Sequence, residues 1–588
     1  MTSNLISKIS SDIRHSAWFD DLDDDFDHAS TNPDSVYARL LGGLFRAAID
    51  VNQFFAGRAN VFPIVYLRDD IYDLLYSNKF GFDSAGLPQV SIGLMEGQSE
   101  VLLEGRSGVS ALPSGDGGTA IEGGRRWRIR LARGRESRQR FSVALESLPA
   151  TDLRAVDRAA AKWRTRGFEV REEEVGTLFG VKGRALDTRR ILLTTGDWSS
   201  EAEADREARV LIQRHDAMGR LHPRVDVRAE GRIIAEDLDT GIKIRAEGVM
   251  WFAPKKGEQL TVRNVLTGVT MGTVKKVDRS YRGQIYVTID RNGKLAVVNQ
   301  VNEIDVLSGL VPAEIFASSA PAALEAQSIA ARGQLLTKIG SRHLDDPYLL
   351  CAHQHCQVYA GSGREHPRTN AAVRRTKGRV LMRPNGTQLV DTVYSANSGG
   401  HTEDNELVWP SPVDDQLRGR PDALAPSQFQ GGITRSNLAD WILRAPRTYS
   451  TPGSTSMAES YRWQTTVDPT KIAGRVGIPK GLGRVDKLEV LKRGRSGRVI
   501  ALRLHAARGE VDLHGELKIR RALGNLKSSL FMLQVGKDSR GHFRLAGGGH
   551  GHGVGMCQHG AMGMAKAGKS HAKILAHYYR GSQLLTLW

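Results

Sequence analysis

The spacing of hydrophobic positions divides most of the chain into short strands and a smaller number of helices. Apolar residues suit helices over residues 151–166, 201–214 and 322–332. Strand-like runs, several beside glycine-containing turns, lie at residues 189–195, 241–246, 259–262 and 283–289. This mixture predicts an α+β fold with several β-rich units and a helix-containing C-terminal part.

Shifts in the pattern divide the 588 residues into five segments. We predict an acidic N-terminal segment at residues 1–90 and a short β segment at residues 95–150. An α+β module is predicted at residues 151–222, a β-rich domain at residues 223–304 and a C-terminal domain at residues 305–588. The acidic phrase at residues 17–23 resembles the magnesium-binding strand end of a P-loop ATPase fragment, although a solvated acidic loop has the same composition. The element order of the α+β module resembles a SPOR-type peptidoglycan-binding module, or any small α+β unit.

Composition narrows the class of protein only partly. The formal net charge of +17 favours an acidic partner, and nucleic acid, anionic lipid and anionic wall polymer all qualify. No helix or zinc module with a known reading frame supports nucleic acid, so we predict that it is not a partner. No stretch reaches the apolar length of a membrane span. Residues 1–30 are polar and then acidic, which is unlike a signal peptide.

A short proline-led segment contains the first candidate catalytic residue. Glu314 ends the sequence Val-Pro-Ala-Glu and precedes the alanine-rich helix predicted over residues 322–332. A proline followed by a glutamate is ordinary chemistry for the start of a helix, where an acidic group complements the dipole. The local sequence alone therefore leaves a structural role and a catalytic role open for Glu314.

A cluster of cysteines and histidines is the second candidate. Cys351, His355 and Cys356 lie within six residues, and His343 precedes them. Two thiolates and two imidazoles can complete a closed tetrahedral zinc site. The spacing is not a standard zinc-finger frame, so buried free cysteines or a local disulfide remain alternatives.

Two small-residue loops are candidate binding loops. The first runs over residues 394–403 and contains the sequence Ser-Gly-Gly-His-Thr-Glu. The second runs over residues 547–561, is rich in glycine and precedes a predicted helix. Such loops expose backbone N–H groups and let a ligand approach closely, although the first could also be a simple hairpin turn.

Together, in this order, these elements resemble the SpoIID/LytB family. The match rests on Val-Pro-Ala-Glu, Ala-Gln-Ser-Ile-Ala-Ala-Arg, His-Cys-Gln-Val-Tyr, Ser-Gly-Gly-His-Thr-Glu and Gly-His-Gly-Val-Gly-Met, and it covers roughly residues 295–588. Two departures stand out: the segment after Glu314 lacks the usual tryptophan, and Cys557 replaces the usual serine.

The resemblance implies a cleft domain that binds peptidoglycan glycan strands stripped of stem peptides. It implies a lytic transglycosylase, or alternatively a non-catalytic enhancer that works with a cell-wall amidase, in the cell envelope. Glu314 would be the catalytic acid, with Glu403 as a fallback, and a structural zinc ion would be held by His343, Cys351, His355 and Cys356. The residues implied in substrate binding are Tyr359, Tyr394, Ser398, Gly399, Gly400, His401, Thr402, Glu403, His552, Gly553 and Gln558.

Two competing motifs point to other enzyme classes. Residues 563–570 formally satisfy the Walker A pattern, but their first half is predicted to be helical and no strand precedes it. Cys557 with His552 and His559 suggests a cysteine hydrolase, although neighbours on a glycine-rich loop cannot be assumed to meet. Each of these two motifs is therefore weaker evidence than the joint pattern of motifs that resembles the SpoIID/LytB family.

Overall fold

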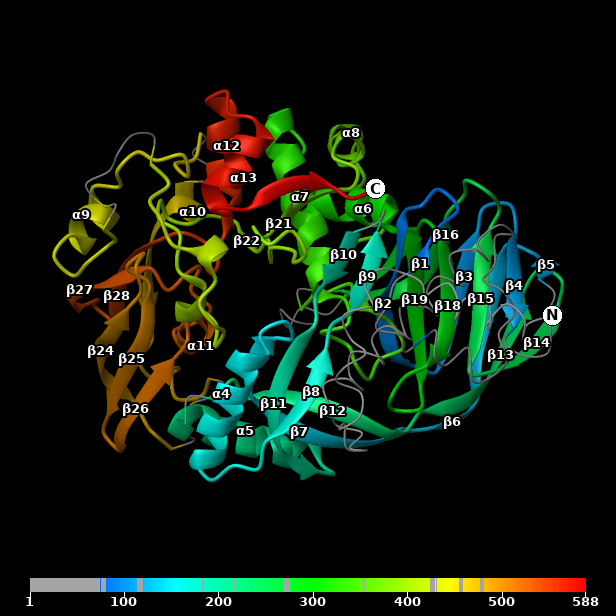
Figure 1. Cartoon of the computed structure of the whole chain (residues 1–588), viewed down its shortest axis with the longest axis horizontal. Coiled ribbons are helices and arrows are strands. Elements are labelled where there is room, and N and C mark those ends of the chain that lie inside the picture. The colour runs from blue at the N-terminus through cyan, green and yellow to red at the C-terminus, as the bar shows by residue number, and fades with distance from the viewer. Residues whose placement is uncertain are drawn as a thin grey trace, which may run out of the picture. The chain divides into compact units, whose positions relative to one another are not determined.

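A computed structural model describes residue 75 and residues 81–588, apart from 114–119, 182–183, 216, 268–274, 354, 424–428, 430, 454–457, 476–477 and 479–480. Most of the predicted acidic segment, residues 1–90, with its P-loop ATPase-like phrase, lies outside the described residues. Among the described helices, none is long and apolar enough to cross a membrane. The architecture is strand-rich and mixed, with several sheets, and is compatible with the predicted α+β class (Figure 1).

Two large sheets enclose the main hydrophobic core. The first has the order β1-β2-β19-β18-β15-β4-β5, with β20 beside β2: Gly81–Phe82, Pro88–Gln98, Leu295–Asn302, Gln284–Ile289, Val249–Pro254, Val109–Pro113, Ile121–Gly123 and Leu350–Cys351. The second has the order β14-β13-β6-β3-β16-β17: Lys243–Glu247, Glu230–Asp237, Arg126–Arg135, Glu100–Gly105, Leu260–Thr267 and Lys275–Tyr281. The predicted segments 95–150 and 223–304 therefore contribute strands to the same sheets.

A separate four-stranded sheet lies between these two contributions in the chain. Its order is β12-β7-β11-β8, and its elements are β7 Arg138–Pro149, α4 Leu153–Thr165, β8 Arg171–Val175, β11 Arg190–Trp198, α5 Glu201–His215 and β12 Arg220–Val227. The hairpin of β9 Leu178–Val181 and β10 Arg184–Asp187 follows β8. This β-α-β-β-α-β order is that of a split βαβ unit. It confirms the helices predicted over 151–166 and 201–214, whereas the SPOR resemblance remains a prediction.

Helices and short strands form the centre of the C-terminal half. They are α6 Glu303–Glu314, α7 Pro321–Lys338, η3 Ser362–Arg364, α8 Pro367–Arg375, β21 Arg379–Met382, β22 Tyr394–Ser395, η4 Asn405–Leu407, η5 Asp415–Leu417, β29 Met556–Cys557, α12 Gln558–Lys566, α13 His571–Tyr578 and β30 Gln583–Thr586. The helix predicted over 322–332 is confirmed within α7. Strand β22 pairs in parallel with β29, which brings the two predicted loops together.

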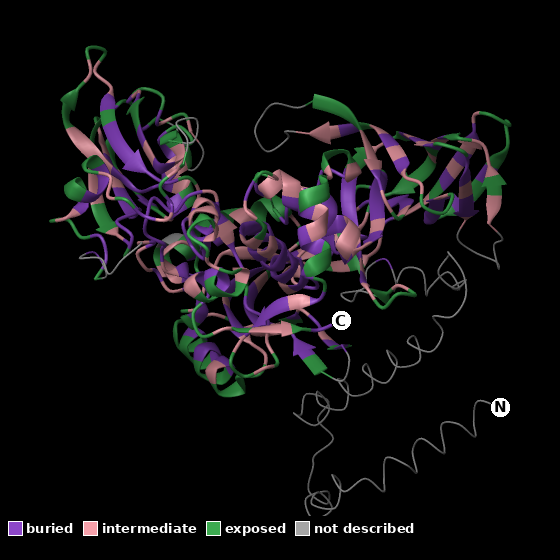
Figure 2. Ribbon diagram, turned by 90° about the horizontal axis from the view of Figure 1, so that it is seen from above, coloured by how far each residue is buried: buried purple, intermediate pink, exposed green. Residues whose placement is uncertain are grey.

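An insertion between β22 and β29 has its own core. It contains α9 Leu438–Leu443, α10 Ala458–Tyr461, β23 Arg462–Val467, β24 Val485–Arg493, β25 Val499–Ala506, β26 Gly509–His514, α11 Glu516–Ala522, β27 Phe531–Lys537 and β28 Phe543–Gly548. Its strands form two sheets, β23-β28-β27 and β24-β25-β26. The middle strands of the two sheets, β25 and β28, are mostly buried, whereas the edge strand β26 is mostly exposed; Figure 2 colours buried and exposed segments differently.

A buried ion pair joins α6, α7 and the C-terminus. Arg332 Nε donates to Glu303 Oε2 at 3.0 Å, and both side chains are 0% exposed. Trp588 Nε1 donates to Glu303 Oε1 at 3.0 Å, so one carboxylate connects three segments.

We expect Glu303→Gln to lower the free energy of unfolding by about 3–5 kcal/mol, because it leaves the buried Arg332 charge without a counterion. Urea unfolding followed by tryptophan fluorescence measures this loss. The matched control is Asp440→Asn, which breaks the exposed pair with Arg444 and should cost at most about 1 kcal/mol. Equal losses in the two variants would contradict the prediction.

Candidate active-site groove and metal centre

A groove of about 390 Å³ opens between the central helices and the insertion. Its lining residues are Glu314, Ile315, Phe316, Ala396, Glu459, Ser460, Lys527, His550, Gln558, His559 and Met562. Glu314 is the last residue of α6, Ile315 and Phe316 follow it directly, and Glu459, Ser460, Lys527 and His550 come from the insertion. Segments far apart in the sequence therefore line one groove.

Glu314 is the last residue of α6, not the first residue of a helix. The expected dipole-complementing role at a helix start is thus wrong, because α6 continues through Pro312 and the carboxyl group lies at the negative end of the helix. Burial raises the pKa of the Glu314 carboxyl, while Gln558 and the charge of Lys338 act in the opposite direction. Among the described residues, no cation lies within ion-pair distance of it.

Gln558 and Tyr394 surround Glu314. Gln558 Nε2 donates to the backbone oxygen of Glu314 at 2.8 Å and to Gln327 Oε1 at 3.3 Å. Burial, followed by the charge of Glu314, raises the pKa of Tyr394. His552 Nε2 donates to the carbonyl oxygen of Tyr394 at 2.9 Å, and the His552 ring packs against Trp409 with a centroid distance of 4.9 Å. These contacts position the end of α6 against β22 and the start of α12.

The Ser-Gly-Gly-His-Thr-Glu loop is buried behind the groove. Ser398, His401, Thr402 and Glu403 are each at most 3% exposed. Gly399 and Gly400 have φ values of 72° and 95°, which favour glycine. None of these six residues lines the groove. Their role in substrate binding remains a prediction. In the structure these residues are packed in the protein interior.

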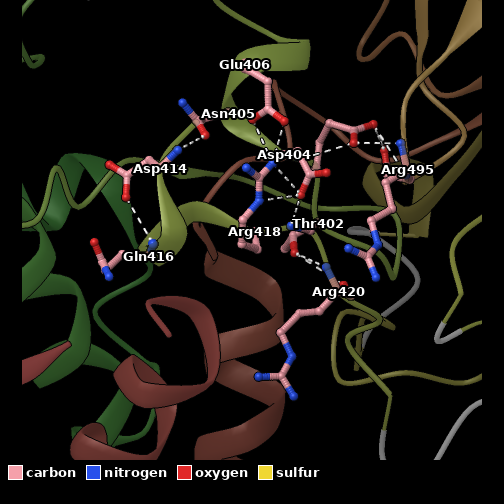
Figure 3. Close-up of polar contacts among 12 residues, drawn as sticks. Thr402, Asp404, Asn405, Glu406, Asp414, Gln416, Arg418, Arg420 and Arg495 are labelled. Carbon is pink, nitrogen blue, oxygen red and sulfur yellow. Dashed lines mark hydrogen bonds and ion pairs between the residues drawn. The ribbon is translucent and has the colours of Figure 1, made fainter. Parts of the chain in front are cut away.

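Glu403 shows how this loop is held. Its carboxylate accepts hydrogen bonds from Ser496 Oγ at 2.6 Å and from the backbone N–H groups of Arg495 and Ser496 at 2.8 and 3.1 Å. Neighbouring Asp404 and Glu406 bind Arg418 (Figure 3). Because Glu403 is 0% exposed, it lies out of reach of a glycan in this conformation.

Tyr359 and Gly553, two other predicted binding residues, also lie in the interior. Tyr359 Oη donates to Asn299 Oδ1 at 3.0 Å, and burial raises its pKa well above the usual value. Gly553 is buried, and a Cβ there would lie 2.3 Å from the Arg498 guanidinium carbon. Of the predicted site residues, Glu314 and Gln558 are therefore the two that line the groove.

The structure also places polar residues in the groove that the sequence did not predict as site residues. Lys527 Nζ pairs with Glu459 Oε2 at 2.9 Å on the insertion. His550 lies in the glycine-rich loop, and burial lowers its pKa. Nothing in the local sequence of Lys527 or Glu459 indicated a site. The two histidines of the groove, His550 and His559, lie on either side of the Gly-His-Gly-Val-Gly-Met motif, which the sequence does indicate as part of a binding loop.

The groove does not support the two competing enzyme classes. Cys557 is 0% exposed, accepts hydrogen bonds from the N–H groups of Ser398 and Gly560 at 3.1 and 3.2 Å, and has a pKa raised by burial. It is therefore a buried thiol without the properties of a nucleophile. In the Walker-like sequence, residues 563–566 belong to α12, and Ser570 caps α13, so no strand leads into a phosphate loop.

The predicted metal ligands converge. His343, Cys351, His355 and Cys356 offer ligand atoms that all lie within 4.8 Å of one another, and the two thiols are free. His343 Nε2 lies 3.2 Å from His355 Nδ1 and 3.3 Å from Cys356 Sγ. His355 Nδ1 lies 3.8 Å from Cys351 Sγ and 3.7 Å from Cys356 Sγ. The cluster could hold a metal ion.

These distances fit tetrahedral coordination. Zinc bonds of about 2.0–2.3 Å separate tetrahedral ligand atoms by about 3.3–3.8 Å. His343 Nδ1 donates to Asp346 Oδ2 at 2.8 Å, which orients the ring and leaves Nε2 as its ligand atom. The Cys356 thiol and, to a lesser extent, His343 hold the pKa of Cys351 far below its usual value, which favours a thiolate.

Comparisons with known proteins agree with the resemblance found in the sequence. Residues 291–382 match the family described as Stage II sporulation protein, and residues 436–555 match a domain of unknown function, DUF8618. The second match covers most of the insertion. The SpoIID/LytB resemblance predicted from the sequence is confirmed by these matches in the C-terminal half of the chain.

Several curated relatives extend this comparison. An amidase enhancer of Bacillus subtilis (strain 168) is 27% identical in an alignment of 304 residues, and the match covers 47% of this chain and 40% of the enhancer. The stage II sporulation protein D of the same organism is 24% identical in an alignment of 351 residues that covers 57% of this chain and 90% of that protein. An uncharacterized protein of Brachyspira hyodysenteriae is 24% identical in an alignment of 308 residues that covers 50% of this chain and 70% of that protein. The chain thus spans less than half of the amidase enhancer.

Proposed function

We propose that this protein acts on the bacterial cell wall as a lytic transglycosylase that cleaves peptidoglycan glycan strands stripped of stem peptides. The observation that carries the proposal is Glu314, a half-buried carboxyl group with a raised pKa at the wall of the groove. A carboxyl group whose pKa is raised by burial holds its proton to higher pH, which suits a general acid. The names of the relatives, amidase enhancer and stage II sporulation protein D, support a role at the cell wall.

The proposed reaction uses Glu314 twice. Protonated Glu314 donates its proton to the glycosidic oxygen as the bond from that oxygen to C1 of a muramic acid residue breaks. The resulting carboxylate then accepts the proton of the C6 hydroxyl of the same sugar, while O6 forms a bond to C1. The products are a shortened strand with a free hydroxyl and a strand ending in 1,6-anhydro-muramic acid, and no water is consumed.

The carboxyl groups of the groove support this internal attack. Besides Glu314, the described lining contains one other carboxylate, Glu459, which is 84% exposed and paired with Lys527. Most hydrolytic glycosidases need a second carboxylate that activates water or attacks the sugar. An exposed and ion-paired Glu459 is poorly suited to that role, whereas a nucleophile supplied by the substrate needs no second carboxylate.

A zinc ion is the proposed occupant of the His–Cys cluster. His343, Cys351, His355 and Cys356 would hold it, and its four protein ligands would leave no open position for substrate. The ion would act as a structural clip, since it joins the loop after α7 to β20, which pairs with β2 of the large sheet.

The alternative is a non-catalytic enhancer in which the groove binds stripped strands and a partner amidase performs the hydrolysis. The relationship to an amidase enhancer favours it, together with the missing tryptophan after Glu314. In either case we propose glycan strands as the partner and the cell envelope as the location.

Mass spectrometry of stripped glycan strands incubated with the full chain tests the proposal. Products ending in 1,6-anhydro-muramic acid are expected. Tight strand binding without cleavage, combined with stimulation of an amidase, would replace the transglycosylase with the enhancer. The full chain is used because the core around α6 and α7 includes strands from residues 88–302.

Lys527 offers a test of the preference for stripped strands. A stripped muramic acid has a free lactyl carboxylate on the sugar, and Lys527 is the cation among the described lining residues. Lys527→Gln is expected to raise KM for stripped strands by about two- to fivefold, because a partly exposed ion pair contributes only a small free energy to binding. Lys537→Gln, at the exposed end of β27, is the matched control. An unchanged KM for Lys527→Gln would remove this residue from recognition.

A further inference from the structure

The wall of the groove beside Glu314 has an exposed aromatic ring. Phe316 is 57% exposed, whereas its neighbour Ile315 is 4% exposed. Ile315 has φ −138° and ψ 146°, and successive residues of an extended backbone point in opposite directions. Ile315 therefore packs in the core with part of its surface at the groove, and the Phe316 ring faces away from the core at the groove. The exposed ring thus lies in the same groove as the candidate catalytic group and offers an apolar face to a ligand there.

The backbone around Phe316 is held in place. Its carbonyl oxygen accepts a hydrogen bond from the N–H of Ser319 at 2.9 Å, and the N–H of Ile315 donates to the carbonyl of Val311 at 3.1 Å. Because this turn is already ordered, a ligand that packs against the ring loses little backbone entropy. Met562 of α12 lines the same groove and adds apolar surface.

The groove also presents a hydrogen-bond donor at His559, which lies on α12 three residues before Met562. Asn397 Oδ1 accepts from the N–H of Gly399 at 2.8 Å, which leaves its amide nitrogen 2.9 Å from His559 Nδ1. Nδ1 is therefore an acceptor, and the proton of the neutral ring is on Nε2. Burial lowers the pKa of His559 to about 4, so the ring is uncharged near neutral pH. No described residue accepts a hydrogen bond from Nε2.

We infer that Phe316 and His559 form a two-sided subsite for one N-acetylated pyranose, in which Phe316 packs against the apolar C–H face and His559 Nε2–H donates to an oxygen of the sugar. The inference rests on the proposed function, since it names the sugar class that the same groove recognises. Both contacts are uncharged, so they recognise the sugar itself rather than a carboxylate.

Binding of a neutral N-acetylglucosamine oligosaccharide to the full chain, measured by isothermal titration calorimetry, tests the subsite. Phe316→Ala is expected to weaken binding roughly tenfold, the effect of losing one aromatic contact, and Phe316→Trp to preserve it. His559→Phe is expected to weaken binding and His559→Gln, which keeps a donor, to retain most of it. Added salt should have little effect, because no charged contact is involved.

The controls separate this inference from the proposed function. Val535→Ala removes a 98% exposed side chain of β27 outside the groove and should leave affinity unchanged. Thermal unfolding midpoints establish that each variant is folded. If the wild type cleaves stripped strands but Phe316→Ala binds the oligosaccharide as tightly as the wild type, the subsite is wrong and the function stands. If the wild type neither binds nor cleaves glycan, the proposed function fails, and the subsite with it.

Discussion

Replacement of Glu314 by glutamine is expected to abolish the release of strands ending in 1,6-anhydro-muramic acid, with kcat falling by about 10²–10⁴-fold. Glutamine has nearly the same shape but can neither donate the proton to the glycosidic oxygen nor accept the proton of the C6 hydroxyl. Quantitative mass spectrometry of the anhydro products measures the change. Release by the variant at the wild-type rate would exclude Glu314 as the acid.

The matched control is Glu459→Gln, which changes the other carboxylate of the groove. Glu459 is 84% exposed and paired with Lys527, so its loss should change kcat little. The Glu314 variant should still bind stripped strands, because Phe316 and His559 are unchanged. Undiminished amidase stimulation by that variant, with no cleavage by the wild type, would support the enhancer.

Glu314→Gln is also expected to change how the stability of the protein depends on pH. Burial raises the pKa of Glu314 in the folded state above its unfolded value of about 4.3. The protonated group favours folding, and this contribution is complete below about pH 4 and is lost as pH rises through the folded pKa. Glu314→Gln should therefore unfold at a higher temperature than the wild type in mildly alkaline buffer and at a similar temperature at low pH. A less stable variant in alkaline buffer would show that the carboxylate makes a favourable interaction.

Removal of the proposed zinc ion is expected to have the largest effect on the fold. Purified wild type should contain one zinc ion per chain by elemental analysis, and Cys356→Ser should contain much less. Because metal binding free energy contributes directly to folding, the variant and the chelated wild type should both unfold at much lower temperature. The loss should centre on residues 343–356, which comprise the end of the loop after α7, β20 and the turn that follows β20, and which contain all four ligands.

Cys557→Ser is the control for this experiment. Cys557 is equally buried but lies outside the cluster, so its variant should retain the metal. All measurements are made with reductant, which removes any contribution from a disulfide. A folded wild type with far less than one zinc per chain, or a full complement in Cys356→Ser, would contradict the assignment.

The sequence by itself determined the parts of this protein that depend on neighbours in the chain. The metal ligands lie within residues 343–356, so one loop brings them together and their residue types predict the cluster. Helical spacing predicted α4, α5 and α7, because i, i+3 and i+4 contacts are local. The order of short motifs also indicated the resemblance to the SpoIID/LytB family and made Glu314 a candidate catalytic residue.

Only the tertiary structure decided which distant segments meet. Strand pairing joins residues hundreds of positions apart, as in β2 with β19, and no local pattern specifies the partner. For the same reason the sequence did not predict that the insertion supplies Lys527 and Glu459 to the groove, or that Ser398–Glu403 would be buried behind it. The position of Glu314 at the end rather than the start of a helix was likewise set by packing of α6, and this position gives its carboxyl group the burial that raises its pKa.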